Sequence, residues 1–191
     1  MRFSLRLFAM AIIFLGAASA TTILTARQAS ADILFGNHEV FDAVIQNNVK
    51  GVEAYLLKGD NVNIRDNSKV PLISRAAENG ALKIVKILIE HGANVNLDDK
   101  LGNSTLMHAA VQGHAEVVDL LLNSAAKIDA ENKQGETSLI KAAQNGQLDV
   151  VRVLIQKSAD VMLTDFTGRS ALDHARDNRH RAVEKLLLTQ Q

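Results

Sequence analysis

Residues 99–131, DKLGNSTLMHAAVQGHAEVVDLLLNSAAKIDAE, are one copy of a pattern that recurs along this 191-residue chain at a fixed step of 33. The stretches 66–98 and 132–164 match it position by position. An Asp or Asn opens each copy, and two alanines and a glycine follow 10 to 14 residues later. Repeats of this length are typical of stacked supersecondary units, because no single unit can bury its own apolar face. The period therefore predicts a solenoid.

Each copy is expected to begin with a turn and a short helix. Asp99 and Gly102 have turn chemistry, since Asp hydrogen-bonds its own backbone and Gly permits a positive φ. Ser104 then stands where a helix N-cap belongs. We expect a first helix over about residues 105–111, which Gly113 ends.

A second helix is expected over about residues 115–123. Its apolar residues recur at steps of three and four, which defines a stripe facing the core. Equivalent stripes occur one unit earlier and one unit later, so like side chains should form a column through the stack. In this copy the stripe is Val117, Val118, Leu121 and Leu122. His114, at the start of this helix, is interpreted as a packing and hydrogen-bonding residue.

The pattern D-x-x-G-x-[ST]-x-L-x-x-A-A-x-x-G-H, with the clear stretches 92–96 (Gly-Ala-Asn-Val-Asn) and Gly113-His114, resembles the ankyrin repeat. The resemblance implies an all-α ankyrin-repeat solenoid of about five stacked helix-turn-helix units. Their expected bounds are 33–65, 66–98, 99–131, 132–164 and 165–191. The family's Thr-Pro-Leu-His tetrapeptide never keeps its His here, which removes the hydrogen bonds that His usually makes to adjoining loops.

The first and last units are predicted to be caps, because a finite stack leaves two faces without a neighbour. In the last unit, Arg176, Arg179 and Glu184 replace residues that are Ala, Gly and Val in the units before it. In the first unit Asn47 replaces the closing Gly. We therefore expect the array itself to end within residues 33–191.

The first 31 residues do not follow the repeat and are interpreted as a secretory signal peptide. Arg2 and Arg6 precede the apolar run 7–16, and small-x-small cleavage patterns end at Ala20 and at Ala31. We prefer cleavage after Ala31, which leaves a domain of 32–191, with cleavage after Ala20 as the alternative. An uncleaved anchor over residues 7–24 is the remaining alternative, and it would be the chain's only membrane attachment. The rest of the chain is expected to be exported, as a periplasmic or a secreted protein.

Several kinds of chemistry are disfavoured by composition and spacing. The chain has no cysteine, which excludes thiolate metal sites, iron–sulfur clusters and cysteine nucleophiles. Basic and acidic residues balance at 21 each, so no nucleic-acid partner is expected. His108 and His174 lie two units apart, too far to share an ion. No serine-nucleophile or phosphate-loop motif occurs. We predict no catalytic residues, no metal and no cofactor.

The resemblance places partner binding on the concave face, made by the inter-repeat turns and the exposed side of the first helix of each unit. A protein partner of unknown identity and a monomeric state are expected. Two other functions stay open: a secreted effector or inhibitor acting on a foreign cell's proteins, and, less favoured, a hydrolase with an unrecognised site. The candidate partner-binding residues are Val70, Asn79, Lys100, Leu101, Asn103, Val111, Gln112, Lys133, Glu136, Asn145, Phe166 and Arg169.

Overall fold

The computed structural model describes residues 39–190, which lie in the second of two compact units, His38–Gln191. The predicted signal peptide, with both of its cleavage sites, lies outside the described residues and stays a prediction. Within the described residues the regular elements are all helices, and the only strand-like pairings are isolated bridges at the bases of hairpins. This confirms the all-α solenoid expected from the sequence.

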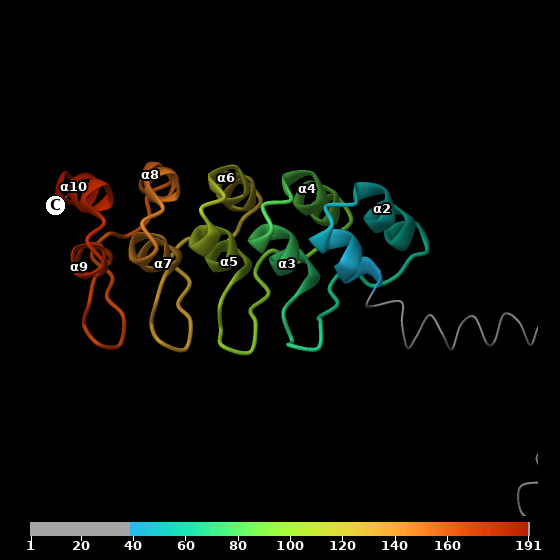
Figure 1. The fold of residues 1–191 in the computed structure, drawn as a ribbon. Coiled ribbons are helices and arrows are strands. Elements are labelled where there is room, and N and C mark those ends of the chain that lie inside the picture. The colour runs from blue at the N-terminus through green and yellow to red at the C-terminus, as the bar shows by residue number, and fades with distance from the viewer. Residues whose placement is uncertain (1–38, 191) are drawn as a thin grey trace, which may run out of the picture. The chain divides into compact units, whose positions relative to one another are not determined.

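The helices form two layers in which each unit contributes one helix to each layer (Figure 1). The inner layer lies next to the hairpin loops, and the outer layer lies on the opposite side. The inner helices are α3 (Leu72–Glu78), α5 (Thr105–Gln112), α7 (Ser138–Gln144) and α9 (Ala171–Asp177). The outer helices are α2 (Val49–Leu57), α4 (Leu82–Glu90), α6 (Ala115–Asn123), α8 (Leu148–Gln156) and α10 (Arg181–Leu188). Residues 39–45 are also helical.

The ends of the inner helices are set by the residues that the repeat predicted. The Ser104 hydroxyl accepts a hydrogen bond from the backbone N–H of Met107 at 3.2 Å, as an N-cap should. Thr137 and Ser170 cap α7 and α9 in the same way. Gly113 ends α5 at a φ of 83°, in the left-handed region that favours glycine. The predicted helices 105–111 and 115–123 are therefore confirmed, the first being one residue longer.

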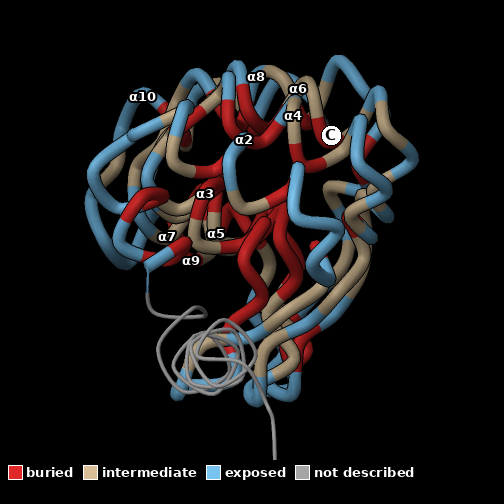
Figure 2. Tube along the Cα trace, turned by 90° about the vertical axis from the view of Figure 1, so that its right-hand side faces the viewer, coloured by how far each residue is buried: buried red, intermediate tan, exposed pale blue. Residues whose placement is uncertain are grey.

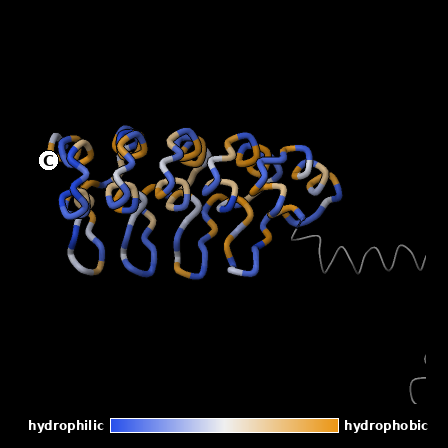
Figure 3. Tube along the Cα trace, in the orientation of Figure 1, coloured by the Kyte–Doolittle hydropathy of each residue, from blue (hydrophilic) through white to orange (hydrophobic). Residues whose placement is uncertain are grey.

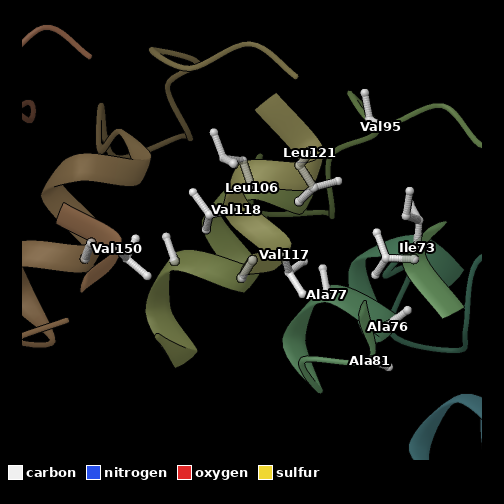
Figure 4. Close-up of a cluster of buried hydrophobic side chains, with 14 of the residues drawn as sticks. Ile73, Ala76, Ala77, Ala81, Val95, Leu106, Val117, Val118, Leu121 and Val150 are labelled. Carbon is white, nitrogen blue, oxygen red and sulfur yellow. The ribbon is translucent and has the colours of Figure 1, made fainter. Parts of the chain in front are cut away.

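The core lies between the two layers, where buried positions repeat from unit to unit (Figure 2). The stripe of α6 lies among side chains of α3, α5 and α8 (Figure 4), with Val117, Val118 and Leu121 all buried. On the inner helices the buried residues include paired alanines such as Ala109 and Ala110, both 0 % exposed. Small side chains let helices approach closely, so the inner helices contact one another more extensively than the outer ones do.

Hydrogen bonds between neighbouring units join the starts of the outer helices α6, α8 and α10 to the end of the inner helix of the preceding unit. His114 donates from Nε2 to the Glu78 carbonyl oxygen at 3.0 Å, and its ring fills the space beside Gly80, where a Cβ would lie 2.6 Å from the ring. The expected role of His114 is confirmed. The other two bonds of this column run from Gln147 to Val111 at 2.8 Å and from His180 to Gln144 at 3.1 Å.

A second column of cross-unit bonds uses the polar residue near the end of each unit. Its side-chain oxygen accepts the backbone N–H of the residue 31 positions further along the chain. The bonds run from Asn94 to Asn63 at 2.8 Å, from Lys127 to Asn96 at 2.9 Å and from Asp160 to Asp129 at 3.1 Å. These bonds lie at the exposed side of the junctions and join each unit to the next.

The last described unit has the polar character expected of a cap. Arg176 and Arg179 are exposed, and Arg176 Nε donates to Glu184 Oε1 at 3.0 Å. Arg179 takes the left-handed conformation (φ 61°) that glycine has at the equivalent position of earlier units. No helix within residues 39–190 is long and apolar enough to cross a bilayer.

Truncation of one core residue tests the assigned stacking. Leu121→Ala removes a side chain that is 0 % exposed, so we expect a loss of roughly 2–5 kcal/mol in the free energy of unfolding. Leu57→Ala, at a side chain that is 84 % exposed, is the matched control and should change stability by less than about 0.5 kcal/mol. Urea unfolding followed by circular dichroism measures both, and equal stabilities of the two variants would contradict the assigned core.

Candidate functional site

The inner face is built from hairpins that are tied to one another. Within a hairpin, Asp99 Oδ1 accepts the backbone N–H groups of Leu101 at 2.8 Å and Asn103 at 2.9 Å. Between hairpins, the backbone N–H of Lys133 donates to the Leu101 carbonyl at 3.1 Å. Phe166 makes the same bond to the hairpin before it, at 3.0 Å. The hairpins therefore form a continuous edge beside the inner helices.

In the second, third and fifth units, a basic side chain on the inner helix faces the residue that opens the unit. Arg75 Nη2 lies 2.7 Å from Asp66 Oδ2, and His174 Nε2 lies 2.8 Å from Asp165 Oδ2. In the third unit His108 Nε2 is 3.2 Å from a carboxylate oxygen of Asp99, at an angle that makes no hydrogen bond. Each pair is nine residues apart in sequence, and the hydrogen-bonded pairs of Arg75 and His174 fix a hairpin onto its own inner helix.

The fourth unit makes the same connection with different residues. Asn132 replaces the opening Asp, and the carboxylate is supplied by Glu136, whose Oε2 accepts from Asn132 at 2.8 Å and from Lys141 at 3.2 Å. Asn132 also donates to Asn103 Oδ1 of the preceding unit at 2.9 Å. The polar network is thus continuous from the third unit to the fourth.

The residues that open the units carry carboxylates that are withdrawn from solvent. Hydrogen bonding keeps these carboxylates ionised. Burial by itself would raise the pKa of Asp165, but hydrogen bonds from Thr167, His174 and the Arg169 backbone outweigh it and lower the pKa well below the ordinary value. The pKa values of Asp66 and Asp99 are lowered by the same balance of burial against hydrogen bonds. The inner face therefore carries fixed negative charge at each of these positions.

A hollow of 150 Å³ opens on this face between α3, α5 and α7. We call it the inner-face hollow. Its apolar side chains are Met107, which is 1 % exposed, and the half-buried Val111. Its polar lining consists of Glu78, Asn103, His108, Gln112 and Lys141. An apolar base inside a ring of polar groups can seat one side chain of a partner.

The structure gathers three of the predicted site residues, Asn103, Val111 and Gln112, at the inner-face hollow. The apolar residues Leu101 and Phe166 lie on the hairpins, 48 % and 74 % exposed. The remaining predicted residues are spread along the same face. Asn79 and Asn145 are exposed at inner-helix ends, Lys100, Lys133 and Arg169 are exposed on the hairpins, and Glu136 is half-buried in the network of the fourth unit.

The prediction that Val70 faces a partner is wrong, because Val70 is buried and only 7 % exposed. Its backbone N–H donates to Asp66 Oδ1 at 2.9 Å. This position lies at the base of the hairpin rather than at its tip, where the chain turns into the inner helix. The equivalent Asn103 is half-buried for the same reason.

Three more residues that line the inner-face hollow, Met107, His108 and Lys141, were not among the positions that the sequence assigned to this face. A signal for two of them was present, since positions 75, 108, 141 and 174 are all basic and each follows a unit's opening residue by nine. His108 had been considered only as a metal ligand. Within residues 39–190, no group of three or more His, Asp or Glu side chains is placed to hold a metal ion.

Stability should depend on pH through the buried Asp165–His174 pair. Because the pKa of Asp165 is lowered in the folded state, its contribution is present above the unfolded value of about 3.9 and is lost as the pH falls below it. Asp165→Asn should therefore be less stable than the wild type at pH 7, with the gap closing towards pH 2. Asp42→Asn, at an exposed carboxylate, is the control. Thermal melts across this range measure the gap, and a constant gap would contradict the assignment.

Comparison with known proteins agrees with this architecture. A family model described as ankyrin repeats (3 copies) matches residues 40–132 and 125–191, which is well over half of the chain. No curated protein sequence gives a significant match. The two-layered helical units, their hairpins and their 33-residue step are those that the resemblance implied. The chain therefore belongs to the ankyrin repeat family.

Proposed function

We propose that this protein is a non-catalytic scaffold that acts outside the cytoplasm and binds a partner protein through the inner face. Ankyrin repeats generally mediate protein–protein interaction. The observation that carries the proposal is the inner-face hollow, where Val111 and Met107 lie inside a ring of polar side chains. Binding energy at protein interfaces concentrates where an apolar anchor is surrounded by polar groups that exclude water.

The charges around the inner-face hollow indicate what the partner should present. Four carboxylates lie on or beside its lining: Asp66, Glu78, Asp99 and Glu136. Arg75 and Lys141 are the Arg and Lys side chains among their ion-pair partners. The four carboxylates therefore outnumber the paired Arg and Lys side chains by two. We therefore expect a partner segment that inserts an apolar side chain and carries basic residues beside it.

Action outside the cytoplasm is supported by the first 31 residues, which have the basic start, apolar run and small-residue cleavage patterns of a signal peptide. The absence of cysteine suits passage through an oxidising compartment. A resident periplasmic scaffold and a secreted effector share these features. Cell fractionation distinguishes them, because a resident stays in the periplasm and an effector accumulates in the medium.

Partner binding should be lost when the inner-face hollow is filled. Val111→Arg places a long cation where an apolar side chain of the partner should sit, so we expect at least a tenfold loss of affinity. Leu101→Ser combined with Phe166→Ser should weaken binding as well, by removing two exposed apolar contacts on the hairpins. The tagged protein first captures partners from the exported fraction, and titration of the purified partner by calorimetry then gives the affinities.

Arg152→Ser, on an exposed position of the outer helix α8, is the matched control and should bind like the wild type. Circular dichroism should show unchanged helicity for all of these variants. Wild-type affinity of both inner-face variants would contradict binding at the inner face. Affinity that does not fall as salt is raised would contradict the basic character expected of the partner.

A further inference from the structure

The outer helices are held further apart than the inner ones, and they leave a groove on the outer face. Where inner helices meet through alanines, outer helices meet through Val, Leu and Ile, so neighbouring outer helices share fewer contacts. This spacing opens a shallow groove of 560 Å³ that lies mainly between α4 and α6 and also reaches Val153 of α8. Its apolar lining is Leu82, Ala115, Leu120 and Val153, all of them half-buried.

The two helices that border this groove carry opposite charges at equivalent positions of the repeat. Lys83 on α4 becomes Glu116 on α6, one step of 33 later, and Lys86 becomes Asp119. Lys83, Lys86 and Glu116 are exposed, and the outer helices carry both hydrophilic and hydrophobic residues (Figure 3). Among the five outer helices in residues 39–190, no other neighbouring pair reverses charge at both positions.

These charges are largely free to meet a partner. No ion pair within 4.0 Å joins Lys83, Lys86 or Glu116 to another described residue, although Lys86 and Glu116 line the same groove. Asp119 pairs with Lys157 at 2.9 Å, but its side chain is still 48 % exposed. The groove therefore has a basic wall on α4, where Lys86 lines it, and an acidic wall on α6, where Glu116 and Asp119 line it, with apolar side chains between them.

We propose that the occupant of this groove is a second copy of the same chain, related by a two-fold axis that runs along the groove. Such an axis places α4 of one copy over α6 of the other. It does not shift the copies along the helices, so equivalent positions of the repeat lie at the same level on both. Lys83 then faces Glu116 of the partner copy, and Lys86 faces Asp119 of the partner copy. The same contacts occur twice, as a two-fold interface requires. The apolar linings of the two grooves then face each other across the axis.

The expected association is weak. A face two short helices wide is smaller than the roughly 1,200–2,000 Å² that stable interfaces bury in total. The expectation of a monomer, made from the sequence, did not take the charge reversal into account. The dimer leaves the inner face open, so it would present two copies of the partner-binding face on opposite sides and does not depend on the function proposed above.

Sedimentation velocity on the purified protein, over about a hundredfold range of concentration, tests self-association of this weak class. We expect the sedimentation coefficient to rise with concentration and to rise less at high salt, because the contacts are ionic. The double variant Lys83→Glu, Lys86→Glu should stay monomeric, and so should Glu116→Lys, Asp119→Lys. An equimolar mixture of the two should associate, because each acidic wall then meets a basic one.

A matched pair of variants with the same changes in net charge controls for general attraction between oppositely charged proteins. These are Lys69→Glu, Lys185→Glu and Asp98→Lys, Glu131→Lys, all at exposed positions outside the groove. Each control variant should self-associate like the wild type. A mixture of the two should associate no more strongly than the wild type does. The proposal would be overturned by a wild type that is monomeric at every concentration. It would also be overturned if the mixture of control variants associated as strongly as the mixture of the two groove variants.

Cross-linking tests the geometry, since the chain has no cysteine of its own. A mixture of Lys86→Cys protein and Asp119→Cys protein should form a disulfide-linked dimer under mild oxidation. Either variant alone should cross-link at least tenfold more slowly, because the two-fold axis sets each position opposite the other one and not opposite itself. Equal rates in the mixture and in the separate samples would rule out this arrangement.

Discussion

Everything in this structure depends on burial between neighbouring units rather than within one. A unit of two short helices has an apolar stripe on its outer helix and alanines on its inner helix, and neither is covered until the next unit packs against them. The polar groups at each junction are satisfied by bonds that also cross it, from His114 to Glu78 and from Asn94 to Asn63. Apolar packing and hydrogen bonding therefore act across the same boundaries.

The difference in side-chain size between the two layers explains both surface features. Alanines bring the inner helices together, and the hairpins beside them are joined by backbone bonds, so that face is continuous and holds the hollow near Val111. The bulkier residues of the outer layer separate its helices, which leaves the groove beside Leu120. One repeated pattern thus produces two surfaces of different character, on which the exposed side chains vary freely.

The sequence predicts well whatever the repeat position itself determines. The caps at Ser104, Thr137 and Ser170, the left-handed Gly113 and the buried stripe of α6 all follow from local rules applied at a 33-residue step. The candidate site was predicted less well. Val70 was assigned to the surface because its sequence neighbours are turn residues, whereas the path of the chain into α3 buries it.

The connections of the inner face were the least predictable from the sequence. Asn132 contacts Asn103, 29 residues away, only because two hairpins pack at a particular separation and tilt. Lys141 reaches Glu136 because the opening residue of that unit is an amide and not a carboxylate. Such contacts depend on three-dimensional placement of neighbouring units, which a periodic pattern does not specify. The recurrence of a basic residue on every inner helix was the one available signal.

Native-state hydrogen exchange tests the dependence of each unit on its neighbours most directly. If the junctions between units provide the stability, amide protection should be highest in α3 to α8, which have units on both sides, and should fall towards α2 and α10. Gln147→Ala, which removes one cross-unit bond to Val111, should lower protection in both α5 and α8. Equal protection in every helix, or a loss confined to the mutated unit, would contradict the account.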